Sequence, residues 1–191
     1  MLRAGLWLKT HPIQGHMVAG TVGGQKIPPV DRYIAGFQYG AKKAFPGVKT
    51  LNDYSQDFVK QAKCKEKALN QIARGSVVEF QVAGQCGLGV LDAAHEKKVY
   101  GIGADADQGY LGSWVMTSAL KRVDVSVYNA IKQAKGPRFK GGRNDVFDAH
   151  NNGVGVGKWA KGVPASIRSA VAKQYKLLKA GKIKGIPTTV K

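Results

Sequence analysis

The chain has 191 residues, with 30 lysines and arginines against 12 aspartates and glutamates, and a formal net charge of +18. This length suffices for one well-packed domain, and the ordinary composition excludes disordered, collagen-like and coiled-coil proteins. No stretch approaches the roughly 18 consecutive apolar residues that a membrane span requires. The basic excess is concentrated at the end, since residues 135–191 carry 13 basic and 2 acidic side chains. Spaced lysines are typical of a solvated helix face, with contact to an anionic envelope surface or to nucleic acid as the alternatives.

Residues 1–16 contain too short an apolar run for a signal peptide, and no small-residue cleavage site follows. We therefore expect no export of the chain as written. Cys64 and Cys86 show neither a Cys-x-x-Cys nor a metal-ligand spacing, so neither a disulfide framework nor a zinc site is predicted. Cys86 lies near an expected helix start, where a small apolar filler is favoured over a reactive thiol.

From Met17 onward, short β-branched runs alternate with helical periods, which predicts β-α-β units and a parallel sheet. Strands are expected near 18–23, 48–53, 77–82 and 99–104. The helices between them are expected to open at Pro28-Pro29, to run from a cap at Asp57 to about Arg74, and to span Gly87–Lys97. The sequence thus predicts an α/β fold, a Rossmann-like three-layer lobe with a parallel central sheet.

The later part of the chain is less regular. A short apolar run at 114–119 leads into a helix expected at 121–135, followed by a Gly-Pro-rich segment at 136–143. A strand is possible at 145–149, and the alternate glycines of 153–157 indicate a loop or an irregular strand. A last helix is expected from Pro164 to about Gly181.

Ligands of open parallel sheets bind outside the carboxyl ends of the strands. The expected strand ends carry glycine, aromatic and carboxylate residues: Gly23-Gly24, Tyr54, Phe80 to Gly84, and Asp105 with Asp107. These side chains should therefore converge on one edge of the sheet.

Each of these residues also has a purely structural interpretation. Asp105 can accept two hydrogen bonds from a vicinal diol of a sugar, but it or Asp107 can equally cap a turn. Phe80 can cover one face of a base or sugar, or belong to the core. The Gly-x-x-Gly-x-Gly segment that begins at Gly84 can bring a ligand close to backbone amides, or can be a glycine-rich turn without a ligand.

Lys121 is expected at a helix start, where the macrodipole disfavours a cation. Either a ligand or a salt bridge to Asp124 would explain it.

Catalytic signatures are missing: the sequence has no Gly-x-Ser-x-Gly, no phosphate loop and no His-Glu-x-x-His. We therefore predict a protein that is not an enzyme and that uses no cofactor or metal.

Four segments together resemble the basic-membrane-protein or purine-nucleoside-receptor family, whose members are substrate-binding lipoproteins of ABC importers. The segments are Gly23–Phe37, Phe80–Gly89, Gly101–Gln108 and Thr117–Asp124. The resemblance implies a type I periplasmic-binding-protein fold, in which two lobes close like a hinge on a nucleoside. It also implies that Asp105 contacts the ribose hydroxyls, that Lys121 makes a further polar contact, and that Phe80 and Gly84 line the ligand. Gly24, Tyr54 and Asp107 are further candidates at the same edge.

Members of the family carry a lipoprotein signal and a complete first lobe before the segment that matches Gly23–Phe37. Residues 1–16 do not resemble that lobe, and we interpret them as a non-homologous or mis-called start; residues 17–191 are interpreted as the carboxyl-terminal lobe. The helix at 121–135 would normally pack on the first lobe, so we expect Val123, Val127 and Ile131 to be exposed.

The partners that the resemblance implies are a nucleoside, the permease of an ABC transporter and the first lobe, with no specific nucleic acid. The implied location is extracytoplasmic and membrane-anchored, although the chain as written, without a signal peptide, would be cytoplasmic. Two alternatives come from other classes: a fragment of an NAD-type dinucleotide-binding enzyme, and a basic domain that binds nucleic acid or the cell envelope. The order of the glycines and the lack of a catalytic acid disfavour the first, and the second requires a steep loss of affinity with salt.

Overall fold

The computed structural model describes residues 17–137, 139–142 and 144–190. Its elements, in chain order, are β1 (Val18–Gly23), α2 (Pro28–Ala44), β2 (Lys49–Thr50), β3 (Asp53–Tyr54), α3 (Gln61–Ala73), β4 (Ser76–Val82), η1 (Gly84–Cys86), α4 (Gly87–Glu96), β5 (Tyr100–Asp105), η2 (Gly109–Leu111), β6 (Val115–Lys121), α5 (Val123–Ala134), β7 (Val154–Val156) and α6 (Ala165–Lys179). The interpretation of residues 1–16 lies outside the described residues.

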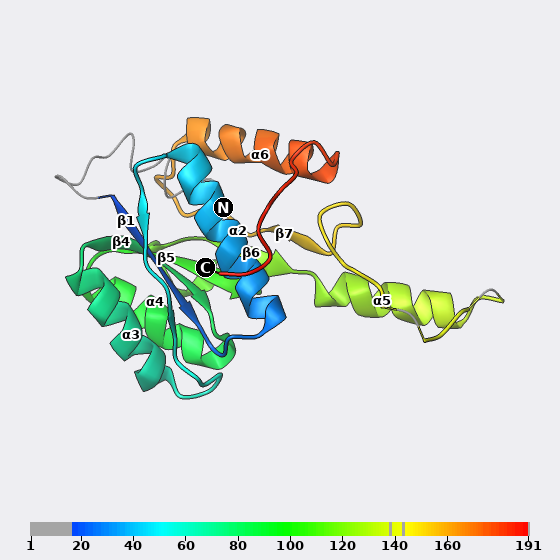
Figure 1. Cartoon of the computed structure of the whole chain (residues 1–191), viewed down its shortest axis with the longest axis horizontal. Helices are drawn as coiled ribbons and strands as arrows, with labels where there is room; N and C mark the ends of the chain where they lie inside the picture. The colour runs from blue at the N-terminus through cyan, green and yellow to red at the C-terminus, as the bar shows by residue number, and fades with distance from the viewer. Residues whose placement is uncertain (1–16, 138, 143, 191) are drawn as a thin grey trace.

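The strands form one seven-stranded sheet within the described residues, in the order β2-β1-β4-β5-β6-β7, and β3 also pairs with β1 (Figure 1). The pairs among β1 to β6 are parallel, and β7 runs antiparallel to β6. The helices α2, α3 and α4 connect parallel strands, as β-α-β units require, whereas only the short η2 separates β5 from β6. The predicted α/β fold with a mostly parallel sheet is therefore confirmed.

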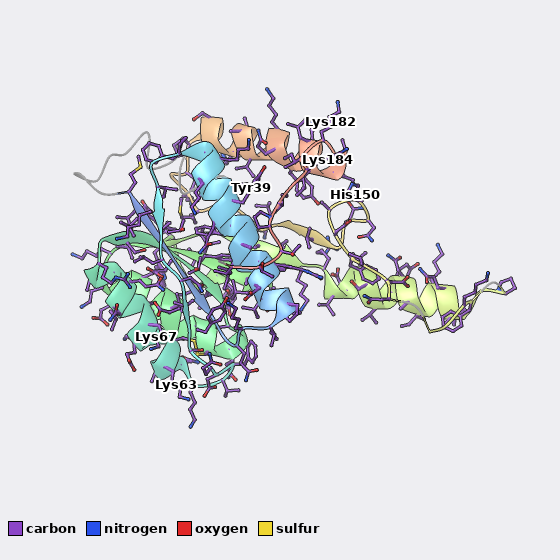
Figure 2. All side chains as sticks on the ribbon, viewed as in Figure 1. Tyr39, Lys63, Lys67, His150, Lys182 and Lys184 are labelled. Atoms are coloured by element: carbon purple, nitrogen blue, oxygen red, sulfur yellow. A yellow bond between two sulfur atoms is a disulfide. The ribbon has the colours of Figure 1, made fainter. Side chains whose placement is uncertain are left out.

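Helices cover both faces of the sheet and enclose two apolar cores. On one face α2 buries Phe37, whose ring lies 5.2 Å from that of Phe80 on β4. On the other face α3 and α4 enclose a core that includes Val22, Ala68 and Val90. The outer face of α3 carries lysines, among them Lys63 and Lys67 (Figure 2). The apolar spacing of α2 thus matches its single buried face, as the sequence predicts.

Cys64 on α3 and Cys86 in η1 form a disulfide, so the prediction of a small apolar filler at Cys86 is wrong. Both residues are fully buried in the core between α3 and α4. A strand and a helical turn separate them in sequence, and only the packing of α3 against α4 brings their Cα atoms within 5.6 Å. Their spacing of 22 residues matches no short motif, which is why the sequence gives no signal for the bond.

α5 leaves the sheet at the end of β6 and extends away from the body of the molecule (Figure 1). No residue of this helix is buried. Val123, Val127 and Ile131 are 52%, 51% and 55% exposed, so the predicted apolar stripe is confirmed within the described chain. Tyr128 beside them is 66% exposed.

The helix expected at 121–135 begins two residues later, because Lys121 is still paired with Val154 in the β6–β7 ladder. The cation therefore does not sit at the positive end of the helix dipole. A salt bridge from Lys121 to Asp124 is not formed either, since Arg122 binds the Asp124 carboxylate at 2.8 Å.

Two further boundaries differ from the prediction. The strand expected at 145–149 is absent, because Asp148 and Asn151 accept hydrogen bonds from nearby backbone amides and form a turn. The strand forms instead at Val154–Val156, within the glycine-spaced segment. Asp57 does not cap α3; its carboxylate accepts hydrogen bonds from the amides of Val59 and Lys60 in the turn before the helix, and these bonds lower its pKa to about 2.

Candidate functional site

The carboxyl ends of the parallel strands meet at one edge of the sheet, which we call the rim and define by Gly24, Tyr54, Gly84, Asp105 and Lys121. Strand register places them together. Gly23 at the end of β1 pairs with Tyr54 on one side and with Val82 on the other, and Asp105 pairs with Leu120, the neighbour of Lys121. The amide of Gly24 also donates to the carbonyl of Val82 at 3.0 Å. Five of the predicted ligand-binding residues thus lie on one edge.

Asp105 and Lys121 are the charged groups of the rim, and both side chains are exposed. Within the described residues, neither takes part in a hydrogen bond or ion pair of its side chain. Asp105 has a φ of 65°, a left-handed backbone conformation that few residues other than glycine adopt. A strained backbone that presents an unpaired carboxylate to solvent is typical of a binding position.

Gly24 and Gly84 both lie close to Phe58, a residue that the sequence analysis did not select. A Cβ atom on Gly24 would overlap with the Phe58 ring, and one on Gly84 would lie 3.4 Å from the Phe58 carbonyl oxygen. That carbonyl also accepts a hydrogen bond from the amide of Cys86 at 2.9 Å. The half-buried Phe58 ring therefore lies beside the rim. The only sequence feature that could have indicated this is that Phe58 is a single aromatic residue in the polar stretch between β3 and α3.

Tyr54 contributes its ring to the rim but not its hydroxyl. The hydroxyl donates a hydrogen bond of 2.5 Å to Oδ1 of the buried Asp31 on α2. Burial raises the pKa of Tyr54 to about 12, and the hydrogen bond to Asp31 adds to this effect. The ammonium group of Lys26 lies 6.0 Å from the centre of the Tyr54 ring.

Tyr33 on α2 was also missed as a neighbour of the site. Its hydroxyl is buried and has no hydrogen-bond partner among the described residues. Burial raises the pKa of Tyr33 to about 12, and the negative charge of Asp105 contributes to the increase. The ring of Tyr33 packs against the core, while its hydroxyl lies close enough to feel the charge of Asp105. In the sequence, Tyr33 therefore looks like any other apolar position of α2.

Phe80 and Asp107 do not belong to the rim. Phe80 is fully buried in the core against Phe37, so the prediction that its ring lines a ligand is wrong and the core interpretation holds. The side chain points into the α2 face because β-strand residues alternate between faces. Asp107 accepts hydrogen bonds from the amides of Lys158 at 3.1 Å and Gly109 at 3.3 Å, so its carboxylate fixes the chain after β5 and is not free for a ligand.

A buried polar cluster lies within the sheet behind the rim. Gln71 on α3 donates hydrogen bonds to the carboxylate of Asp53 at 2.7 Å and to the carbonyl of Thr21 at 3.0 Å. Its own side-chain oxygen faces the carboxyl group of Glu79 above Gly20. Desolvation raises the pKa of Glu79 to about 8, and the nearby Asp53 acts in the same direction. Glu79 is therefore mostly a neutral acid at neutral pH.

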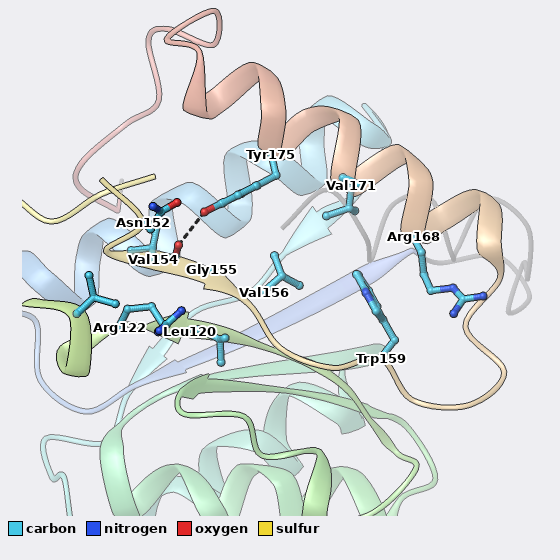
Figure 3. Close-up of a pocket in the computed structure, with 12 residues that line it drawn as sticks. Leu120, Arg122, Asn152, Val154, Gly155, Val156, Trp159, Arg168, Val171 and Tyr175 are labelled. Atoms are coloured by element: carbon cyan, nitrogen blue, oxygen red, sulfur yellow. Dashed lines mark hydrogen bonds between the residues drawn. The ribbon is translucent and has the colours of Figure 1, made fainter. Parts of the chain in front are cut away.

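A groove of about 570 Å³ lies next to the rim, between β6, β7 and α6 (Figure 3). Arg122, Trp159 and Arg168 line it, and the hydroxyl of Tyr175 donates to the carbonyl of Val154 at 2.9 Å. No rim residue contributes to its wall.

The described part of the chain contains no group of three or more potential metal-ligating side chains. Among the described helices, none is both long and apolar enough to cross a membrane.

The fold and the rim define a class: this chain has the fold of ABC-transporter solute-binding proteins. A crystal structure of such a protein from Aeropyrum pernix K1 superposes with a TM-score of 0.81 at 24% identity, and covers 97% of this chain and 62% of that one. The family described as "ABC transporter substrate-binding protein PnrA-like" matches residues 7–187, and the chain belongs to it. This is a family of binding proteins, so the prediction that the chain is not an enzyme is confirmed.

Two curated relatives illustrate the family. The "CD4+ T-cell-stimulating antigen" of Listeria monocytogenes is 30% identical over 198 residues, which cover 95% of this chain and 54% of the relative. The "ABC transporter nucleoside-binding protein BmpA" of Lactococcus lactis is 30% identical over 182 residues, which cover 86% and 51%. The chain thus spans about half the length of the curated relatives it matches. The family resemblance drawn from the four sequence segments is confirmed.

Proposed function

We propose that this chain forms one wall of a nucleoside-binding site that supplies an ABC importer. The observation that carries the proposal is the pair Asp105 and Lys121, which are exposed, unpaired within the described residues and adjacent at the rim. The name of the Lactococcus lactis relative, a nucleoside-binding protein, supports the ligand class.

The chemistry of the rim suits a ribose with an attached base. The Asp105 carboxylate accepts hydrogen bonds from the two vicinal hydroxyls of the sugar, and the Lys121 ammonium donates to a sugar oxygen. The exposed Gly84 has no side chain and lets the ligand approach the backbone, while the Phe58 ring offers an apolar face beside it. Both charged groups act by binding and orienting, and no proton transfer is involved.

A second lobe, outside these 191 residues, completes the site in this proposal. α5 supports it, because Val127 and Ile131 are each more than half exposed on a helix without any buried residue. Closure of two lobes around a ligand desolvates the polar contacts and adds contacts on the opposite side. One lobe alone should therefore bind a nucleoside weakly, several orders of magnitude below the affinity of a complete cleft.

We also propose that the complete protein is an extracytoplasmic lipoprotein that delivers its ligand to a transporter permease. Relatives from Pyrococcus species are named lipoproteins, at 32% identity over 151 residues, and they support this location. The buried disulfide agrees with it, since such bonds persist in oxidising compartments outside the cytoplasm.

The test is a titration of the purified chain with inosine, adenosine and guanosine, followed by chemical-shift changes in NMR spectra, which detect weak binding. We expect shifts at Gly84, Asp105 and Lys121. Asp105→Asn should reduce affinity by at least tenfold, because a hydrogen bond to a charged group contributes about 1.5–3 kcal/mol. Asp92→Asn, on the exposed surface of α4, is the matched control and should leave affinity unchanged.

Equal affinities of the Asp105→Asn variant and the unmodified chain would refute the role of the rim. Submicromolar binding by the unmodified chain would refute the requirement for a second lobe. Binding of NAD in preference to the three nucleosides would favour a dinucleotide-binding protein instead.

A further inference from the structure

The carboxyl-terminal part of the chain carries positive charge without any carboxylate side chain to balance it. Residues 149–191 contain no aspartate or glutamate. The lysines and arginine described in this part are all exposed: Lys158, Lys161, Arg168, Lys173, Lys176, Lys179, Lys182 and Lys184. Most of them belong to α6 or directly follow it.

Helical geometry gathers these charges on one side of α6. Ile167 and Val171 are its buried residues and face the body of the molecule. At about 100° per residue, Lys173 and Lys176 lie on the opposite side of the helix, and Arg168 and Lys179 lie on its flank. We call Arg168, Lys173, Lys176, Lys179, Lys182 and Lys184 the α6 basic face.

The positive surface continues beyond the end of the helix. Lys182 and Lys184 lie near its carboxyl-terminal end, on the same side of the molecule as His150 (Figure 2). A Cβ atom on Gly181 would lie 3.5 Å from Nε2 of His150, so the turn after α6 contacts this imidazole. The basic face therefore extends from α6 onto the following segment.

The lysines of α3 show what a balanced helix surface looks like in the same molecule. Lys63 pairs with Asp57 at 3.2 Å, and Lys65 pairs with Asp92 at 2.7 Å and with Glu96 at 3.1 Å. By contrast, within residues 144–190 no side chain of the α6 basic face pairs with a carboxylate; Lys179 donates to the amide oxygen of Asn152. Uncompensated like charges repel one another, and an anionic partner would relieve the repulsion.

We propose that the α6 basic face is a docking surface for an anionic lipid bilayer. The inference rests on the proposed function in one respect, the location at a membrane surface. α6 has 15 residues and is therefore about 22 Å long, so its cations form an extended row that suits a planar surface of lipid head groups.

Nucleic acid suits this face less well than lipid does. Five of the six cations are lysines, which act as point charges, whereas bidentate recognition of phosphates and stacking on bases favour arginine. Binding of single strands also uses exposed aromatic rings. Trp159, before α6, and Tyr175, on α6, are half-buried and line the groove of Figure 3.

The test is co-sedimentation of the chain with vesicles of phosphatidylcholine, with and without one-third phosphatidylglycerol. We expect binding only to the anionic vesicles, and its loss at about 1 M salt, where the Debye length falls to about 3 Å. The variant Lys173→Gln/Lys176→Gln/Lys179→Gln should bind about 100-fold more weakly, since each lysine near an anionic membrane contributes about fivefold.

The matched control removes the same number of charges from α3 and the residue before it, by Lys60→Gln/Lys63→Gln/Lys67→Gln, and should weaken vesicle binding by less than fivefold. If both triple variants lost vesicle affinity equally, binding would depend only on net charge, and the assignment of the docking surface to the α6 basic face would be refuted. Equal binding to neutral and anionic vesicles would refute the proposal. Displacement from vesicles by duplex DNA of equal total charge at about 0.15 M salt would assign the surface to nucleic acid.

The proposed nucleoside binding and the proposed lipid docking can be refuted independently of each other. The α6 variant should keep the nucleoside affinity of the unmodified chain, because its substitutions lie outside the rim. Vesicle binding without nucleoside binding would refute the proposed ligand and leave the docking surface standing.

Discussion

Replacement of Glu79 by glutamine should remove a large pH dependence of stability. Glu79 is fully buried on β4, and neither of its carboxyl oxygens accepts a hydrogen bond among the described residues. The nearby Ser76 hydroxyl lowers the pKa of Glu79 in part, but in this structure it donates to the carbonyl of Val78 instead. The side-chain oxygen of Gln71, which faces Glu79 above Gly20, accepts no hydrogen bond from a described residue either. A single proton on Glu79 supplies the missing donor, because the acid can then donate to Gln71.

The magnitude follows from the pKa. Burial raises the pKa of Glu79 from its ordinary value of 4.5 to about 8. Because the folded-state pKa lies above that of the unfolded chain, the contribution of Glu79 is fully present below pH 4.5 and is lost as the pH rises to 8. At about 1.4 kcal/mol per pH unit, the loss amounts to as much as about 5 kcal/mol. Asp53, the nearest other carboxylate, acts in the same direction.

The assay is urea unfolding of the unmodified chain and the Glu79→Gln variant between pH 4.5 and 8.5. The amide of glutamine can donate to Gln71 at every pH, so the stability advantage of the variant should grow by about 1.4 kcal/mol per pH unit up to pH 8. Glu66→Gln, at an exposed position on α3, is the control and should change nothing. If the free energies of unfolding of the unmodified chain and the Glu79→Gln variant changed in parallel with pH, the conclusion that Glu79 is a neutral acid in the folded chain would be refuted.

Two further predictions concern the disulfide and α5. Reduction of the bond between Cys64 and Cys86, or its replacement by two serines, should lower the free energy of unfolding by about 3 kcal/mol, because the bond closes a loop of 22 residues; a thermal midpoint unaffected by reductant would contradict this. Val127→Ser/Ile131→Ser should change the free energy of unfolding by no more than about 0.5 kcal/mol, because both side chains are exposed. A loss of several kcal/mol of stability in this double variant would show that the helix is packed within this chain.

The sequence predicts the sheet and the first three helices well because their signals are local. The proline pair before α2 and its apolar spacing specify a helix with one buried face, and short β-branched runs specify the parallel strands. The features that it misses depend on tertiary contacts. Cys64 meets Cys86 only through the packing of α3 on α4, and β7 exists because β6 offers a free edge to a glycine-rich segment that has little strand preference.

The residues of the rim and its neighbours also include some that the sequence predicts and some that depend on tertiary contacts. Strand ends identify Asp105 and Lys121, because parallel strands must bring their carboxyl ends to one edge. The sequence does not decide which face Phe80 occupies, since both interpretations suit a strand phenylalanine. Phe58 has no periodic signal at all, and its place beside the rim follows from the turn at Asp57 and from the contact with Gly24.

The α5 stripe and the α6 basic face suit different partners on physical grounds. The α5 stripe of Val123, Val127 and Ile131 is apolar, and covering it gains free energy only if the partner is apolar as well. The α6 basic face gains nothing from such a partner, because burying unpaired lysines against apolar atoms costs several kcal/mol each. A second lobe on α5 therefore leaves α6 free, and an anionic membrane on α6 leaves the rim and α5 free. In the proposals made above, a ligand, a second lobe and a lipid surface therefore use three separate parts of the chain.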